Sequence, residues 1–184
     1  MKTINTDIDG VVILEPTIIE DARGYFFESF SQKRFNKEVN ETIFVQDNES
    51  ASLYGVVRGL HFQKGEHSQA KLVRVVYGEV LDVAVDIRKS SPTFGKYVSV
   101  RLNDKNKRQF FIPHGFAHGF SVLSEKVIFQ YKCDRYYCPE SEGSIRWNDP
   151  DLNINWGIAP QNIILSEKDA ISPFFKDNLR NLFD

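Results

Sequence analysis

The chain has 184 residues, of which 41% are hydrophobic and 26% charged, which is typical of a globular protein with one sizeable core. Its 23 basic and 25 acidic residues give a net charge of −2, so no overall positive field favours nucleic acid as a partner. The longest apolar run near the N-terminus, residues 11–14, is far too short for a signal-peptide core or a membrane span. We therefore expect one cytoplasmic domain over residues 1–184 that binds neither nucleic acid nor membranes.

Short apolar stretches separated by turn-forming residues predict an all-β body. Many short strands at this spacing are typical of a sandwich or barrel and not of alternating strands and helices. One early helix is predicted over residues 32–39, with Ser31 as its N-cap. After Pro150 the pattern weakens into loops and short helical turns, which we expect to cover one end of the body. The predicted strands span residues 10–14, 24–30, 44–48, 56–61, 71–77, 81–87, 97–102, 109–112, 120–123 and 127–133.

The segment 81–87 shows the strand pattern most clearly. All of its odd positions are apolar, while Asp82 and Asp86 occupy even positions. A strand sends alternate side chains to opposite faces. The sequence therefore predicts a half-buried strand, with one face in the core and the other outside it.

Strand parity places three polar residues on otherwise apolar faces. Tyr131 shares a face with Phe129, His118 shares one with Phe120, and Lys71 heads the apolar face of its predicted strand. Each of them alone could be a strand-end group that reaches water. Buried polar groups are costly unless they are paired, so the three together indicate a functional site inside the body.

The two cysteines, Cys133 and Cys138, lie on a predicted strand and its exit turn. Their close spacing is a weak basis for either a disulfide or a zinc site. We therefore expect two reduced cysteines, as is usual in a cytoplasmic protein.

Residues 58–63 (Arg-Gly-Leu-His-Phe-Gln) and 113–119 (Pro-His-Gly-Phe-Ala-His-Gly) resemble the paired signature blocks of a cupin jelly roll. Metal-binding cupins usually carry His-x-His in the first block. Here the second of these positions is Gln63, a poor metal ligand, although His61 and His118 remain. This combination suggests a histidine that is used for proton chemistry.

The chain as a whole resembles the dTDP-4-dehydrorhamnose 3,5-epimerase family along nearly its full length. The resemblance implies a cupin-type jelly roll with a few short helices, mainly near the N-terminal third and the C-terminus, and with no metal or cofactor. It also implies a homodimer that inverts C5 and C3 of a dTDP-linked 4-keto-6-deoxyhexose on the route to dTDP-L-rhamnose. The matching segments are residues 21–28, 44–48, 55–63, 71–76, 78–94, 112–123, 130–142, 147–152 and 165–169.

The resemblance assigns four residues to the reaction. C3 and C5 flank the C4 ketone, so removing either proton gives an enolate whose charge spreads onto O4. His61 would be the base, since an imidazole pKa of about 6.5 suits that role, and Asp169 would pair with it. Tyr131 would return a proton to the opposite face, because a phenol of pKa about 10 can reprotonate a carbanion. Lys71 would stabilise the charge on O4.

The resemblance also implies contacts with the ligand. Tyr137 matches an aromatic residue that stacks on thymine, and arginine and lysine side chains would bind the diphosphate. In the family the N-terminal strands cross to the partner subunit, so Arg23, Phe26 and Glu28 would contact the ligand in the neighbouring site. The expected substrate-binding residues are Arg23, Phe26, Glu28, Gln46, Asp47, Asn48, Arg58, His118, Tyr137, Glu142 and Lys168.

Three alternative functions remain open. Relatives that epimerise only one carbon share most of these motifs, and a departure from the family pattern such as Phe62 could alter the shape of the pocket. A metal-dependent cupin enzyme could use His61, Glu66 or His67, and His118 as ligands. A non-catalytic nucleotide-sugar binder could use the same scaffold, because a fold does not determine a function.

Overall fold

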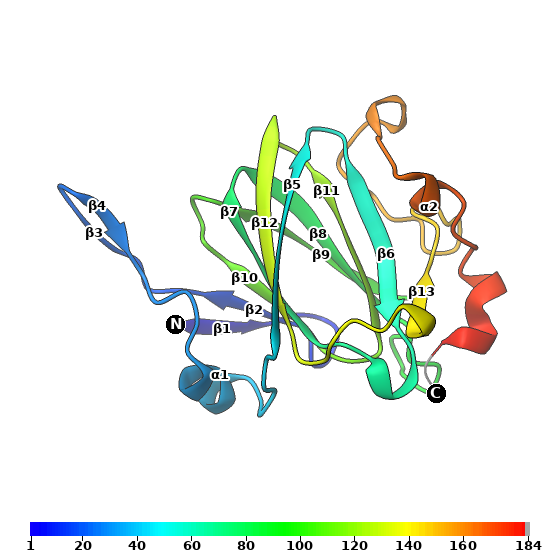
Figure 1. The fold of residues 1–184 in the computed structure, drawn as a ribbon, viewed down its shortest axis with the longest axis horizontal. Coiled ribbons are helices and arrows are strands. Elements are labelled where there is room, and N and C mark those ends of the chain that lie inside the picture. The colour runs from blue at the N-terminus through cyan, green and yellow to red at the C-terminus, as the bar shows by residue number, and fades with distance from the viewer. Residues whose placement is uncertain (183–184) are drawn as a thin grey trace.

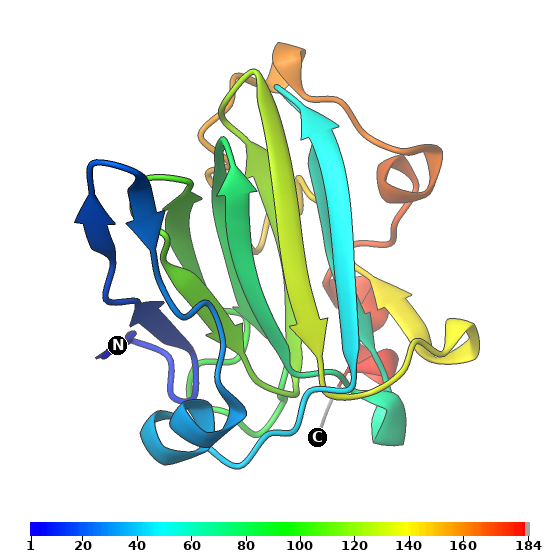
Figure 2. The same cartoon turned by 60° about the vertical axis from the view of Figure 1, so that its left-hand side comes forward.

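The alternating stretches form two antiparallel sheets that pack face to face in the computed structural model, which describes residues 1–182 (Figure 1). The sheets make an open sandwich and do not close into a barrel, which confirms the all-β jelly-roll prediction in its sandwich form. Figure 2 shows the six-stranded sheet in front and the C-terminal segment, orange to red, on the far side.

The six-stranded sheet has the spatial order β1 (Lys2–Asn5), β2 (Val12–Glu15), β10 (Gln109–Ile112), β7 (Lys71–Tyr77), β12 (Lys126–Cys133) and β5 (Gln46–Leu53). The five-stranded sheet has the order β13 (Glu142–Ser144), β6 (Val57–Gln63), β11 (Phe116–Val122), β8 (Glu79–Asp86) and β9 (Tyr97–Asn103). A separate hairpin, here called the arm, consists of β3 (Ile19–Asp21) and β4 (Gly24–Phe26). The helices are α1 (Gln32–Glu38), α2 (Glu167–Ala170) and the short 3-10 helices η1 (Gly65–His67), η2 (Pro139–Ser141), η3 (Pro160–Asn162) and η4 (Lys176–Asn181).

The main hydrophobic core lies between the two sheets. Val73, Phe110 and Phe129 enter it from the six-stranded sheet, and Ala84 and Phe120 enter it from the five-stranded sheet. All five are at most 5% exposed. Burying side chains of this size supplies the main free energy that holds the sheets together.

Each sheet is also covered on its outer side. The outer face of the five-stranded sheet, with Val83 and Val85, packs against Trp156 and Phe175 of the C-terminal segment. The outer face of the six-stranded sheet packs against Phe35 of α1. The C-terminal segment therefore covers a face of the sandwich, and the prediction that it covers one end was wrong in this respect.

The prediction that segment 81–87 is half-buried was wrong as well. Val83, Val85 and Ile87 pack under the C-terminal segment, while Asp82 and Asp86 on the other face are both 0% exposed. Asp82 alternates with Val80 and Ala84, which belong to the core between the sheets. The strand is buried on both faces, and its aspartates point into the protein.

Most predicted elements are present, with shifted ends. Residues 71–77 and 109–112 match β7 and β10, and the helix begins at Gln32 after the N-cap Ser31 as predicted. The strand predicted over 24–30 ends at Phe26, and the one predicted over 44–48 starts at Gln46 and continues to Leu53. The prediction missed the short strands β1, β3 and β13.

β6 and β11 approach each other closely beside His61. Gly59 has a φ of +107°, and a Cβ atom there would lie 2.6 Å from the carbonyl oxygen of His118. A Cβ atom on Gly119 would lie 2.6 Å from the carbonyl oxygen of Arg58. Both distances are shorter than van der Waals contact, so the two glycines allow the strand spacing seen here.

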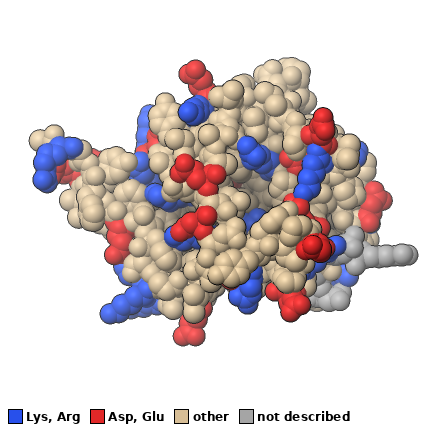
Figure 3. All heavy atoms as spheres, in the orientation of Figure 1, with Lys and Arg blue, Asp and Glu red and all other residues tan. Residues whose placement is uncertain are grey.

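Charged side chains of both signs are interspersed over the face of the molecule in Figure 3. Neither sign dominates that face, which agrees with the net charge of −2. Among the described residues, no helix has the length and apolar character needed to cross a membrane.

Asp86, the last residue of β8, organises the connection to β9. Its carboxylate accepts hydrogen bonds from the Arg88 guanidinium at 2.7 and 2.9 Å and from the hydroxyls of Ser91 and Thr93, both at 2.6 Å. Burial alone would raise the pKa of Asp86, but these hydrogen bonds outweigh it and lower the pKa to about 2. The ionised carboxylate therefore stabilises the folded state.

Replacing Asp86 with Asn should lower the free energy of unfolding at neutral pH by about 2 kcal/mol, as expected from linkage for a shift of this size. The difference should be fully present above the unfolded pKa of about 4. It should be lost as the pH falls through about 2, where the native carboxyl becomes protonated. Urea unfolding across this pH range measures it, with the exposed Asp7→Asn as a control. A difference that does not vary with pH would contradict the prediction.

Candidate active site

His61 of β6 and Asp169 of α2 form a hydrogen-bonded pair. The imidazole Nε2 lies 2.6 Å from Asp169 Oδ1, although 108 positions separate the two residues in the chain. Asp169 is buried, at 3% exposed, whereas 33% of the His61 side chain remains exposed. A carboxylate in this position fixes the tautomer of the ring and stabilises its protonated form.

Ser166 holds Asp169 in place. As the N-cap of α2, its hydroxyl accepts a hydrogen bond from the Asp169 N–H at 3.1 Å and donates one to Oδ2 at 2.8 Å. Burial alone would raise the pKa of Asp169, but the interactions with His61 and the Ser166 hydroxyl outweigh it, and the pKa is lowered. Asp169 is therefore an anion beside His61 at neutral pH.

Tyr131 and Lys71 lie on the inner face of the opposite sheet, as strand parity predicted. Tyr131 of β12 packs against the core, and Lys71 opens β7 with its Nζ 5.9 Å from the centre of the Tyr131 ring. Burial raises the pKa of the Tyr131 phenol, which therefore keeps its proton at neutral pH. Burial also lowers the pKa of the Lys71 ammonium, and the acidic groups of Cys133, Asp82 and Glu142 oppose this shift.

A second buried pair, His118 and Asp82, lies next to the first. His118 is the direct cross-strand neighbour of His61, and its Nε2 is 2.9 Å from Asp82 Oδ1. Asp82 Oδ2 is buried and has no hydrogen-bond partner among the described residues. Burial raises the pKa of Asp82, while attraction to His118 opposes that shift. The sequence pattern does not identify Asp82 as a site residue, because an aspartate that alternates with apolar residues also indicates an exposed strand face.

β5, an edge strand of the six-stranded sheet, lies beside this region together with β6. Asn48 of β5 pairs directly with Tyr131, and Gln46, two residues along the same face, donates a hydrogen bond to the Asn48 side chain at 3.0 Å. Arg58 of β6 reaches across and donates from Nε to the Ser52 hydroxyl of β5 at 3.0 Å. Gln46, Asn48 and Arg58 are therefore gathered along one side of the sandwich.

Tyr137, Glu142 and Lys168 form a connected group at the same side. The Tyr137 hydroxyl donates to Glu142 at 2.9 Å, and Lys168 Nζ lies 2.6 Å from the same carboxylate. The Tyr137 N–H donates to the side-chain oxygen of Gln46 at 3.2 Å. The Tyr137 ring is otherwise exposed, at 55%. An exposed aromatic face beside a lysine is a suitable surface for a nucleotide base and its phosphates.

Four of the predicted site residues are not brought to this group. Arg23 and Phe26 belong to the arm, which extends away from the sandwich (Figure 1), and Glu28 pairs with Arg34 at 3.2 Å near its root. Asp47 points to the outer face of β5, where it forms an ion pair with Lys132 at 2.7 Å. Its neighbours on either side point inward, as strand alternation requires.

Other polar residues of the two histidine-bearing segments, 58–63 and 113–119, are engaged elsewhere. Gln63 donates to the carbonyl oxygen of His67 and accepts from the N–H of Cys138, both at 2.7 Å. His114 lies 2.7 Å from Asp134. In the part of the chain that the structure describes, no three His, Cys, Asp or Glu side chains are arranged to hold a metal ion. The Gln63 side chain thus forms hydrogen bonds with the backbone of two neighbouring loops.

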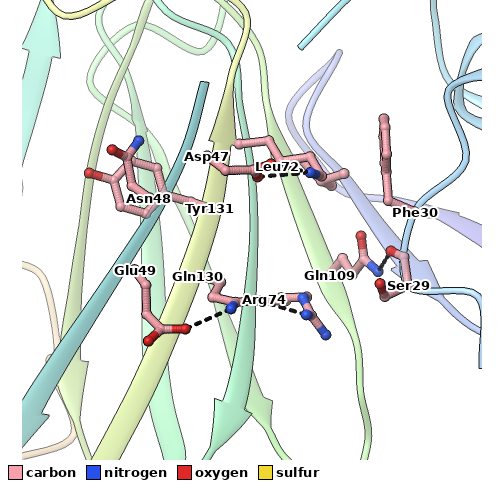
Figure 4. Close-up of a pocket in the computed structure, with 11 residues that line it drawn as sticks. Ser29, Phe30, Asp47, Asn48, Glu49, Leu72, Arg74, Gln109, Gln130 and Tyr131 are labelled. Carbon is pink, nitrogen blue, oxygen red and sulfur yellow. Dashed lines mark hydrogen bonds and ion pairs between the residues drawn. The ribbon is translucent and has the colours of Figure 1, made fainter. Parts of the chain in front are cut away.

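A cavity of about 340 Å³ lies against the six-stranded sheet beside the root of the arm (Figure 4). Much of its lining comes from outward-facing residues such as Glu49, Gln130 and Arg74, which are joined by hydrogen bonds of 2.7 and 2.6 Å. Ser29 and Phe30 close its other side. Asn48 and Tyr131 also line this cavity, so it borders the candidate active site.

An imidazole backed by a carboxylate on one sheet, and a protonated phenol on the facing sheet, are groups that general acid–base chemistry uses. The lysine beside the phenol adds a cation that can stabilise developing negative charge. The fold and the site are thus those of a jelly-roll protein that carries the side chains used in acid–base catalysis.

Comparisons with known proteins identify the family. The sequence profile of dTDP-4-dehydrorhamnose 3,5-epimerase matches residues 5–177. The enzyme of that name from Salmonella typhimurium is 54% identical over 180 residues, covering 97% of this chain and 98% of its own length. The chain belongs to the dTDP-4-dehydrorhamnose 3,5-epimerase family.

Solved structures agree with this assignment. A Legionella pneumophila dTDP-6-deoxy-D-glucose-3,5-epimerase, in complex with dTDP-4-keto-L-rhamnose, is 52% identical with a TM-score of 0.95 and covers 99% of this chain and 97% of its own. A 3'-monoepimerase from Streptomyces bikiniensis, in complex with dTDP-quinovose, is 31% identical with a TM-score of 0.86. The match covers 95% of this chain and 88% of that protein's chain. The fold is thus shared by enzymes with different regiochemistry.

Removing the Ser166 hydroxyl should raise the pKa of Asp169, because the carboxylate loses one of its hydrogen bonds. We expect the rise in Ser166→Ala, together with a loss of about 1 kcal/mol of stability from the missing helix cap. Ser166→Thr keeps a hydroxyl and should keep the pKa low. NMR titration of the Asp169 carboxyl carbon measures the effect, and equal pKa values in all three proteins would contradict it.

Proposed function

We propose that the chain inverts C5 and C3 of dTDP-4-dehydro-6-deoxy-D-glucose to give dTDP-4-dehydro-L-rhamnose, a precursor of dTDP-L-rhamnose and of polysaccharides made from it. The observation that carries the proposal is that His61 and Tyr131 belong to facing sheets. A sugar ring held between them has the base on one side and the acid on the other. Epimerisation needs that arrangement, since a proton must leave one face of a carbon and return to the opposite face.

His61 begins each inversion by taking a proton from the carbon next to the C4 ketone. The C–H electron pair becomes the carbon–carbon double bond of an enolate, and the negative charge moves to O4. Asp169, which is ionised and 2.6 Å from Nε2, stabilises the imidazolium that forms. Lys71 supplies the positive charge that stabilises O4, the largest energetic demand of enolate chemistry.

Tyr131 completes the inversion by donating its phenolic proton to the other face of the same carbon. The raised pKa of this buried phenol keeps the proton available at neutral pH. The enolate double bond becomes a C–H bond again, and the ketone re-forms. His61 and Tyr131 then return to their starting protonation states by proton exchange with water, and the second carbon reacts in the same way.

The nucleotide lies along the open side of the sandwich. Thymine stacks on the exposed ring of Tyr137, and Arg58 and Lys168 bind the diphosphate. Glu142 supports both ends of this subsite, because it contacts Tyr137 and Lys168 directly. Gln46, Asn48 and His118 contact the sugar from the inner faces of their strands.

The enzyme acts as a homodimer in which the arm of each subunit completes the site of the other. A hairpin with three-residue strands is not stable alone in water, and the arm exposes 62% of Ile19 and 69% of Phe26. β5 is an edge of the six-stranded sheet beside the candidate site, and an open edge can pair with a strand from a second copy. Arg23, Phe26 and Glu28 then reach the partner's ligand.

The proposed function predicts hydrogen exchange at both carbons. When dTDP-4-keto-6-deoxyglucose is incubated with the protein in deuterated water, NMR should show deuterium at C3 and at C5 together with the inverted product. Exchange at one carbon only would make the chain a mono-epimerase, and binding without exchange would make it a nucleotide-sugar binder. Treatment with a chelator should leave the rate unchanged. A rate that is lost and then restored by one divalent metal would support the metal-dependent alternative.

The two acid–base residues should respond differently to substitution. His61→Ala should lower both exchange and turnover by about 10²–10⁴-fold, because the proposed base is lost. Tyr131→Phe leaves His61 and Lys71 in place, so the enolate forms and is mostly reprotonated from the side of His61. Exchange with deuterated solvent should therefore become faster than inversion. Inverted product at the parent rate in Tyr131→Phe would show that Tyr131 is not the acid.

A further inference from the structure

Lys107 is a buried lysine that the proposed reaction does not use. It lies in the turn between β9 and β10, is 8% exposed and has a φ of +51°. Its ammonium donates a hydrogen bond to the Tyr25 hydroxyl at 2.9 Å and lies 4.4 Å from the centre of the Tyr25 ring. Tyr25 is the central residue of β4, so this contact ties the arm to the body of its own subunit.

The contact with Tyr25 replaces part of the solvation that the Lys107 ammonium loses on burial. A charge removed from water costs free energy unless nearby groups replace its solvation. The phenol oxygen accepts a hydrogen bond, and the face of an aromatic ring attracts a cation, so Tyr25 offers two stabilising interactions at once. Loss of either residue would leave the arm without this attachment.

The contact also determines which way the arm faces. Because alternate side chains of a strand point to opposite sides, turning Tyr25 toward Lys107 turns Phe26 away from the body. Phe26 is 69% exposed, and the side chain of Arg23, in the turn of the hairpin, is 89% exposed. Arg23 and Phe26, which are expected to meet a second subunit, are thus exposed while Tyr25 between them contacts the body of its own subunit.

We propose that Lys107 is a positioning residue, which fixes the arm of its own subunit so that Arg23 and Phe26 reach the active site of the partner. This inference rests on the proposed function, in which the arm contributes to the neighbouring site. Lys107 acts only through Tyr25 and does not touch the substrate. Its substitution therefore affects binding at the partner's site and leaves the acid–base groups of its own site in place.

Steady-state kinetics provide the first test. Lys107→Met should raise KM about tenfold with little change in kcat, because the arm supplies binding contacts and not the base or the acid. Lys107→Arg keeps a cation at the same backbone conformation and should keep KM near the parent value. Tyr25→Phe, which keeps the ring and loses the hydroxyl, should raise KM less than Lys107→Met. Lys105→Met, at an exposed lysine in the same turn, is the matched control.

Mixed dimers distinguish positioning from local damage to the fold. In a dimer of a His61→Ala/Lys107→Met chain with a parent chain, the one working site receives the loosened arm, and its KM should be raised. In a dimer of a His61→Ala chain with a Lys107→Met chain, the one working site receives an intact arm, and its KM should be that of the parent. If the raised KM instead follows the chain that carries both Lys107→Met and the working site, the proposal is overturned.

Arg23→Ala separates failure of this proposal from failure of the proposed function. A raised KM in Arg23→Ala with a parental KM in Lys107→Met would overturn the role of Lys107 and leave the role of the arm intact. A parental KM in both variants would show that the arm does not serve the neighbouring site, which overturns both. A raised KM in both, with the effect of Lys107→Met acting across the mixed dimer, supports the proposal.

Discussion

The packing of the C-terminal segment on the outer face of the five-stranded sheet places a carboxylate behind His61. Apolar side chains such as Trp156 and Phe175 hold the segment on the sheet, and backbone hydrogen bonds of 3.0 and 2.8 Å join Ile164 to the start of β6. Asp169 follows five positions later in a short capped helix. The hydrogen bond of the His61 imidazole with Asp169 therefore depends on a hydrophobic interface formed by the C-terminal segment.

Much of the fold could be predicted because most strands follow a simple alternation. Residues 71–77 and 109–112 were located without error, since apolar side chains and turn residues mark both ends. The errors arose where burial does not follow polarity. Asp82 and Asp86 resemble solvent-facing residues in the sequence, but both are completely buried. Asp82 lies beside His118 between the sheets, and Asp86 accepts several hydrogen bonds. The sequence pattern of an aspartate that faces water is the same as that of an aspartate that faces buried polar partners.

Some residues of the candidate site could likewise be predicted from strand alternation, and others could not. Parity alone predicted the inward direction of Lys71, His118 and Tyr131, because each has apolar neighbours two positions away. The pairing of His61 with Asp169 came only from the family resemblance, since no local pattern joins residues 108 positions apart. Alternation along β5 gives the outward direction of Asp47, because Gln46 and Asn48 on either side of it point inward. The proposed contacts of the arm with a second subunit likewise came only from the family resemblance.

Gly59 and Gly119 have a consequence for how differences between relatives should be interpreted. They occupy neighbouring strands of one sheet, and each leaves room for a backbone carbonyl of the other strand. The distance between His61 and His118 on these strands therefore depends on the absence of a side chain at both positions. A side chain at either position would push the two strands apart and move His61 away from His118. This displacement would occur whichever ligand is bound. A glycine retained at either position in a relative would thus reflect backbone spacing, although it would be easily mistaken for a residue that touches the sugar.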